Sequence, residues 1–140
     1  MKSTILLVED DELDVINVRR SLAKLNLEAD LIVAFNGIEA LDLIKKRIES
    51  GLPVPQVTLL DLNMPKMDGL EFLHQLQKEN LSHLTKVFVM TTSSEIADRN
   101  RVDMYHISGY LIKPLNFNNN AKKQDSMEGF FDFHLRKILA

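Results

Sequence analysis

The chain has 140 residues, of which 45% are apolar and 26% are charged, and its formal net charge is -3. This length fits one domain, and the composition is typical of ordinary globular proteins. A mildly acidic chain lacks the basic field that holds a nucleic-acid backbone, so we expect no direct nucleic-acid binding. No apolar run approaches the roughly 20 residues that span a bilayer, and the chain has no Cys. We therefore expect a cytoplasmic protein that does not enter the membrane.

Short apolar runs rich in β-forming residues predict five strands. They cover residues 4–9, 31–35, 57–61, 86–91 and 109–113. Longer segments with apolar residues at helical spacing lie between these runs and after the last one. Such alternation favours βαβ units, so we expect an α/β fold built on a five-stranded, doubly wound parallel sheet.

Five helices are expected to cover this sheet. The first two have apolar stripes at i, i+3, i+4 and i+7 spacings, formed by Val15, Val18, Leu22 and Leu25 and by Ile38, Leu41, Ile44 and Ile48. Three more are expected around residues 69–79, 95–106 and 121–139. No long linker interrupts the pattern, which predicts one domain over residues 1–140 and no separate output domain.

The first strand runs directly into acidic residues, beginning with Glu9 and Asp10. In an open parallel sheet, ligands bind beyond the carboxyl ends of the strands, where the strand order reverses. If the first and third strands are neighbours there, Glu9 and Asp10 meet Asp61, which ends the third strand. Three converging carboxylates need a compensating cation, and a cluster of oxygen ligands suits Mg²⁺. Each of these two strand ends is therefore predicted to supply half of the ligands of one metal site.

Both acidic segments also have simpler interpretations. Asp10, Asp11 or Glu12 can cap the following helix, because carboxylates favour a helix N-terminus. Asp61 can instead stabilise a turn in the segment "LLDLNMPKMDG", where a proline and a glycine end the strand and favour a loop. Neither segment alone decides between these interpretations and a metal site.

The fourth and fifth strands end in "VMTTSS" and "YLIKP", which bring the hydroxyl of Thr91 and the ammonium of Lys113 to the same sheet edge. A carboxylate nucleophile, a metal ion and donors to the remaining oxygens are the parts needed for phosphoryl transfer to Asp61. Thr91 would donate a hydrogen bond to the phosphoryl group, and Lys113 would supply positive charge.

The motifs "ILLVEDDE", "LLDLNMPKMDG", "VFVMTTSS" and "SGYLIKP", in this order and spacing, resemble the receiver domain of two-component response regulators of the stand-alone type. The resemblance covers essentially the whole chain and implies a flavodoxin-like sheet of order 2-1-3-4-5. It also implies that Asp61 accepts a phosphoryl group from a sensor histidine kinase. Mg²⁺, or alternatively Mn²⁺, would be held by Glu9, Asp10, Asp61 and the backbone carbonyl of Asn63.

The same resemblance implies how such a protein signals. Thr91 and Tyr110 would form the switch pair, and phosphorylation would change the surface of helix 4, strand 5 and helix 5. The domain would catalyse only its own phosphoryl transfer and dephosphorylation. Its other partners would be a histidine phosphotransfer protein, another protein target, or a second copy bound through that surface. Two departures stand out: Glu9 occupies a position where many relatives have Asp, and the segment after Pro114 begins with poor helix formers, which leaves the start of helix 5 open.

Two other classes compete with this interpretation. A Mg²⁺-dependent phosphatase would share the aspartyl-phosphate chemistry, but it usually needs a second Asp as acid and base shortly after the nucleophile. Asn63 stands two residues after Asp61 and cannot transfer that proton. A binding module without phosphorylation would not need the complete set of acidic, Thr and Lys residues.

Overall fold

A computed structural model describes residues 3–24, 29–62, 67–92, 101–105 and 107–113. Its single sheet has five strands in the order β2-β1-β3-β4-β5, and every neighbouring pair is parallel. The strands are β1 (Ser3–Val8), β2 (Ala29–Ala34), β3 (Val57–Asp61), β4 (Lys86–Thr92) and β5 (Gly109–Lys113). The predicted fold and strand order are confirmed, with strand ends shifted by two residues at most.

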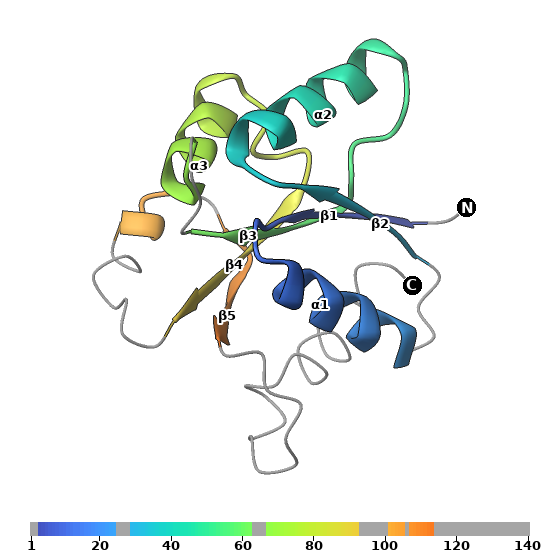
Figure 1. Cartoon of the computed structure of the whole chain (residues 1–140). Coiled ribbons are helices and arrows are strands. Elements are labelled where there is room, and N and C mark those ends of the chain that lie inside the picture. The colour runs from blue at the N-terminus through green and yellow to red at the C-terminus, as the bar shows by residue number, and fades with distance from the viewer. Residues whose placement is uncertain (1–2, 25–28, 63–66, 93–100, 106, 114–140) are drawn as a thin grey trace.

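Among the described residues, three helices pack on this sheet, α1 (Glu12–Lys24) on one face and α2 (Gly37–Glu49) and α3 (Gly69–Lys78) on the other (Figure 1). The helix expected around 95–106 is described only from residue 101, where one short helical segment passes into a turn. The helix expected around 121–139 lies outside the described residues. Within the described part of the chain, no helix is long and apolar enough to cross a membrane.

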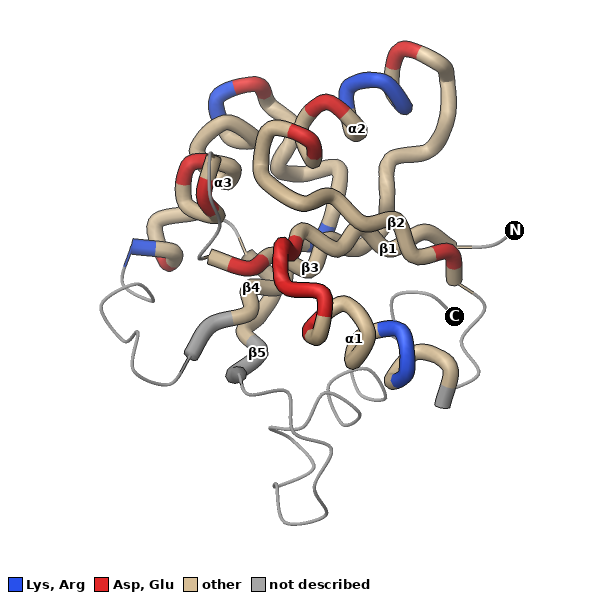
Figure 2. Tube along the Cα trace, viewed as in Figure 1, with Lys and Arg blue, Asp and Glu red and all other residues tan. Residues whose placement is uncertain are grey.

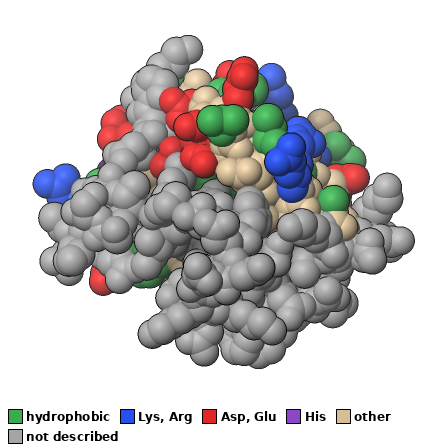
Figure 3. Space-filling model, turned by 60° about the horizontal axis from the view of Figure 1, so that its bottom comes forward, with side chains coloured by type: hydrophobic (Ala, Val, Ile, Leu, Met, Phe, Trp, Pro, Cys, Tyr) green, Lys and Arg blue, Asp and Glu red, His purple; other side chains and the backbone are tan. Residues whose placement is uncertain are grey.

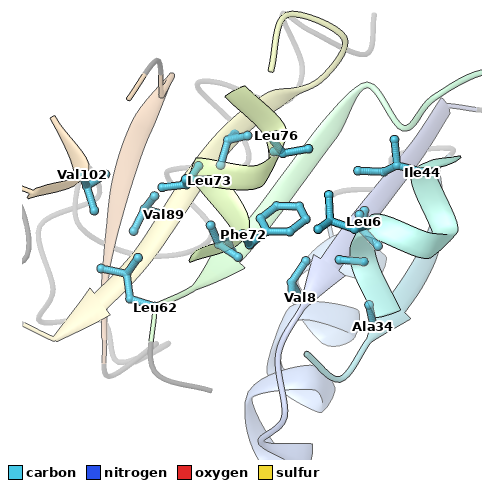
Figure 4. Close-up of a cluster of buried hydrophobic side chains, with 14 residues drawn as sticks. Leu6, Val8, Ala34, Ile44, Leu62, Phe72, Leu73, Leu76, Val89 and Val102 are labelled. Atoms are coloured by element: carbon cyan, nitrogen blue, oxygen red, sulfur yellow. The ribbon is translucent and has the colours of Figure 1, made fainter. Parts of the chain in front are cut away.

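The core has two layers, one on each face of the sheet. Leu6, Val8 and Val89 point toward α2 and α3, where Phe72 of α3 is fully buried among them (Figure 4). The alternate positions of the same strands, including Ile5, Leu7 and Met90, form the second cluster together with residues of α1. Because both faces are covered, the central strands read as continuous apolar runs rather than as alternating ones.

The apolar stripe predicted for α2 is only partly buried. Leu41 and Ile44 lie in the core, as expected, whereas Ile38 and Ile48 are 46% and 43% exposed. Ile48 lies in the last turn of α2. The inner face is completed instead by two small residues, Gly37 and Ala40.

Candidate functional site

The site begins at Glu9, where the chain leaves β1. The Glu9 amide donates to the carbonyl oxygen of Ala34 at 3.0 Å, which continues the pairing with β2 by one residue. The side chain is fully buried, and its Oε1 accepts a hydrogen bond of 3.2 Å from the amide of Asp11. Glu9 is therefore a buried carboxylate that is held by the loop following it.

Asp11 caps α1. Its Oδ1 accepts hydrogen bonds from the amides of Leu13 and Asp14, at 2.9 and 3.3 Å, which are donors that the first helical turn cannot satisfy by itself. The sequence did not decide which residue caps this helix, Asp10, Asp11 or Glu12. Because Asp11 performs this role, the neighbouring carboxylate of Asp10 is available for the site.

Asp61 ends β3 beside β1, where Val8 pairs with Leu60, and it is 5% exposed. The chain then turns into α3, and the Gly69 amide donates to the carbonyl oxygen of Leu62 at 3.1 Å. A Cβ at Gly69 would lie 2.7 Å from both the carbonyl oxygen of Asp61 and the Cα of Leu62. Only glycine permits this close approach, which places the start of α3 against the backbone that carries Asp61.

Carboxylate oxygens of Glu9, Asp10 and Asp61 lie within 4.8 Å of one another. The first and last residues are buried, while Asp10 is exposed and lies on the solvent side of the group. Figure 2 shows the acidic start of α1 beside the end of β3, and Figure 3 shows acidic side chains gathered next to exposed hydrophobic ones. The two acidic strand ends predicted to converge do so, and we call this group the acidic pocket.

The acidic pocket fits a small divalent cation. Buried carboxylates require pairing or a metal ion, and oxygen ligands are the preference of Mg²⁺. Ligands on opposite sides of Mg²⁺ lie about 4.2 Å apart, since each is about 2.1 Å from the ion. The carboxylate oxygens of the acidic pocket all lie within 4.8 Å of one another, an upper limit slightly above that span. Asn63, whose carbonyl was the fourth predicted ligand, lies outside the described residues.

Thr91 and Lys113 occupy the ends of β4 and β5 at the same edge of the sheet. Asp61 pairs with Met90, the residue before Thr91, and Thr92 pairs with Lys113. The backbone positions of these predicted site residues therefore agree with the arrangement expected from the sequence. The other predicted switch residue, Tyr110, pairs with Val89 nearer the start of β5.

Two contacts around the site were not predicted. The Gly37 amide donates to the carbonyl oxygen of Met67 at 3.0 Å, and a Cβ at Gly37 would come within 2.8 Å of that oxygen. The loop after β2 thus supports the loop that leaves the acidic pocket. The Tyr110 hydroxyl donates to Oδ1 of Asp103. Asn36 caps α2, with its Oδ1 accepting a hydrogen bond of 2.9 Å from the Glu39 amide, and an Asn before a helical pattern is the sequence signal for this helix start. No periodic pattern links Asp103 with Tyr110.

The fold and pocket together define a doubly wound α/β domain with a carboxylate cluster at the point where strand order reverses. The response regulator receiver domain family matches residues 5–123, and the chain belongs to this family. Proteins of this kind act in two-component signalling.

Three comparisons with two relatives illustrate the similarity. Response regulator Rcp1 of Synechocystis sp. is 32% identical over 128 residues, which cover 91% of this chain and 87% of Rcp1. The structure of the Mn²⁺-bound form of Rcp1 superposes with a TM-score of 0.75 at 33% identity, covering 94% of this chain and 93% of that one. The phosphorylated cyanobacterial phytochrome response regulator RcpA has a TM-score of 0.78 at 26% identity, with 98% and 96% covered.

Proposed function

We propose that this protein is a phosphorylation-controlled switch in which Asp61 accepts a phosphoryl group from a sensor histidine kinase. The observation that carries the proposal is the acidic pocket, in which Asp61 ends a central strand within 4.8 Å of two further carboxylates. Membership of the receiver family supports the same role, because response regulators are phosphorylated by such kinases. The phosphorylated form of RcpA, a structural relative, is consistent with it.

The proposed reaction is an in-line displacement. A carboxylate oxygen of Asp61 attacks the phosphorus of a phosphohistidine, an O–P bond forms, and the P–N bond breaks so that the imidazole leaves with the bonding electrons. No general base is needed, because a carboxylate nucleophile has no proton to lose when it attacks. Thr91 would donate a hydrogen bond to a phosphoryl oxygen, and Lys113 would offset its charge. Their places at the ends of β4 and β5 support these roles.

Mg²⁺ or Mn²⁺ would be held by carboxylates of Glu9, Asp10 and Asp61 together with the backbone carbonyl of Asn63. The ion would neutralise the oxygens that gather during transfer. The three carboxylates supply the hard oxygen ligands that such ions prefer, and the Mn²⁺-bound form of the relative Rcp1 supports this assignment. The hydrogen bond from the Asp11 amide orients the Glu9 carboxylate.

The protein would signal through a phosphorylation-dependent change in its binding surface rather than by converting a substrate. Phosphorylation adds roughly -1.5 to -2 charge at Asp61. The responding surface would be formed by β5 and the fourth and fifth expected helices, around residues 95–106 and 121–139, with Thr91 and Tyr110 as the switch pair. The protein would work in the cytoplasm as one receiver unit over residues 1–140. That surface would bind a histidine phosphotransfer protein, another protein target or a second copy.

Labelling with a small phosphodonor tests the proposal. In the presence of Mg²⁺, the intact mass should increase by one phosphoryl group, and Asp61→Asn should abolish the increase. Asp42→Asn is the matched control, because Asp42 is an exposed carboxylate on α2 outside the acidic pocket. Undiminished acid-labile labelling of Asp61→Asn would contradict the proposal, as would full labelling in excess EDTA.

A further inference from the structure

Tyr110 is tied to the protein surface by a contact outside the acidic pocket. Its hydroxyl donates a hydrogen bond to Oδ1 of Asp103, an exposed residue. The Tyr110 ring is half-buried and packs against the core layer between the sheet and α2 and α3. Hydrogen bonds to an ionised acceptor are stronger than those between neutral groups. The Asp103 carboxylate therefore holds the hydroxyl of Tyr110, while the Tyr110 ring packs against the core.

The acceptor lies on a well-anchored turn. Val102, the residue before Asp103, is fully buried. The amide of Tyr105 donates to the carbonyl oxygen of Val102 at 2.9 Å, and the Tyr105 ring meets that of His74 edge to face, with centroids 6.4 Å apart. These contacts fix the backbone on both sides of Asp103 to the core and to α3. The Asp103 carboxylate is consequently carried by an anchored stretch of backbone.

The sheet connects this hydrogen bond to the acidic pocket. Asp61 pairs with Met90 on β4, and the preceding residue of β4, Val89, pairs with Tyr110 on β5. A displacement of the end of β4 by a phosphoryl group on Asp61 thus acts next to the strand that carries Tyr110. Phosphorylation can shift an equilibrium between two conformations of the protein only if it stabilises one of them more than the other. Breaking the Asp103–Tyr110 bond would be part of that difference.

We propose that Asp103 is a positioning residue for the switch: its carboxylate holds the Tyr110 hydroxyl at the protein surface, and phosphorylation of Asp61 favours the state in which this hydrogen bond is broken. This inference rests on the proposed function. It predicts that removal of the Asp103 carboxylate favours the phosphorylated state, because one interaction that opposes this state is lost.

The first measurement is spectroscopic and needs no phosphorylation. The chain contains two Tyr residues, so ring signals of isotope-labelled tyrosine can be assigned with Tyr105→Phe. Asp103→Ala should move the Tyr110 ring signal, and Asp103→Asn, which keeps an oxygen acceptor, should restore part of the native shift. Asp30→Ala is the control, because Asp30 is exposed on β2 at the opposite edge of the sheet. An unchanged Tyr110 signal in Asp103→Ala would overturn the proposal.

The second measurement is the affinity for beryllofluoride, a phosphoryl mimic, in the presence of Mg²⁺. Asp103→Ala should bind it about three- to tenfold more tightly, the effect expected for one hydrogen bond at a partly exposed site. The same substitution in a Tyr110→Phe background should have no effect, because the donor hydroxyl is already absent.

The outcomes separate this inference from the function on which it rests. If the native protein binds no beryllofluoride, the proposed function fails and the switch role of Asp103 fails with it. If the native protein binds it normally, either of two affinity results overturns only the role of Asp103, as does an unchanged Tyr110 ring signal. One is an unchanged affinity in Asp103→Ala, and the other is an equal change in the Tyr110→Phe background.

Discussion

The backbone amide of Asp11 donates a hydrogen bond to the buried carboxylate of Glu9, while the side chain of Asp11 caps α1. One residue thus joins the start of a helix to a carboxylate of the acidic pocket. The orientation of Glu9 depends on the same turn of backbone that begins α1. Helix capping and assembly of the site are consequently coupled in this loop.

Replacing Asp11 tests this coupling. Asp11→Ala should lower the free energy of unfolding by about 1 kcal/mol, since the first turn of α1 loses its cap. It should also weaken Mg²⁺ binding, because the loop that orients Glu9 is less restrained. Asp11→Ser keeps a capping oxygen and should restore most of both properties. Urea unfolding and calorimetry measure the two effects, and a stability loss without any change in Mg²⁺ affinity would show that the cap does not support the pocket.

Replacing Asp10 should weaken metal binding without destabilising the metal-free protein. Asp10→Ala removes one of three clustered carboxylates, so Mg²⁺ affinity should fall at least about tenfold. The metal-free protein should be as stable as the native one or more stable, because repulsion between like charges is relieved. Thermal unfolding with and without Mg²⁺ measures both effects.

Glu12→Ala is the matched control for Asp10→Ala, since Glu12 is an exposed acid in the first turn of α1 and does not belong to the acidic pocket. It should leave Mg²⁺ affinity within a factor of about two, as screened surface charges contribute little. Equal losses of affinity in the two variants would point to general surface charge and would remove the specific role of Asp10.

Replacing two different glycines distinguishes the effect of close packing from the effect of backbone conformation. Gly69→Ala places a Cβ 2.7 Å from the backbone beside Asp61, so the backbone must shift. We expect a loss of about 1–3 kcal/mol in stability together with impaired phosphorylation. Gly51→Ala meets no atom within 4 Å but has a φ of +70°. It should cost about 1 kcal/mol and leave labelling intact. Labelling kinetics and urea unfolding check both variants, and normal labelling of Gly69→Ala would contradict the packing argument.

A buried pair of hydroxyls joins β3 to the residue before β4. The Oγ1 atoms of Thr58 and Thr85 are 2.9 Å apart, and both residues are buried. Thr85→Val should cost about 1–3 kcal/mol, because the Thr58 hydroxyl loses this partner in the interior. The double variant Thr58→Val with Thr85→Val should recover part of the loss. A double-mutant cycle by urea unfolding measures the coupling, and strictly additive losses would argue against it.

The sequence by itself determined the strands and the order of the elements along the chain. Continuous apolar runs predict buried parallel strands, and the carboxylates directly after the first and third runs predict where charge meets at the sheet edge. Glu9, Asp10 and Asp61 were identified in this way because a strand end and its first polar residue are local features. The structural order of the strands followed from the family resemblance.

Only the tertiary structure decided which acidic residue caps α1, how far the stripe of α2 is buried, and which residues meet across the chain. Asp10 and Asp11 are chemically alike, and their roles separate only when β3 brings Asp61 beside β1. Likewise, Gly37 meets Met67 because two loops pack against each other. The periodicity of apolar residues indicates the local secondary structure of each segment. Contacts such as these depend instead on how the packed core places segments that are distant in sequence.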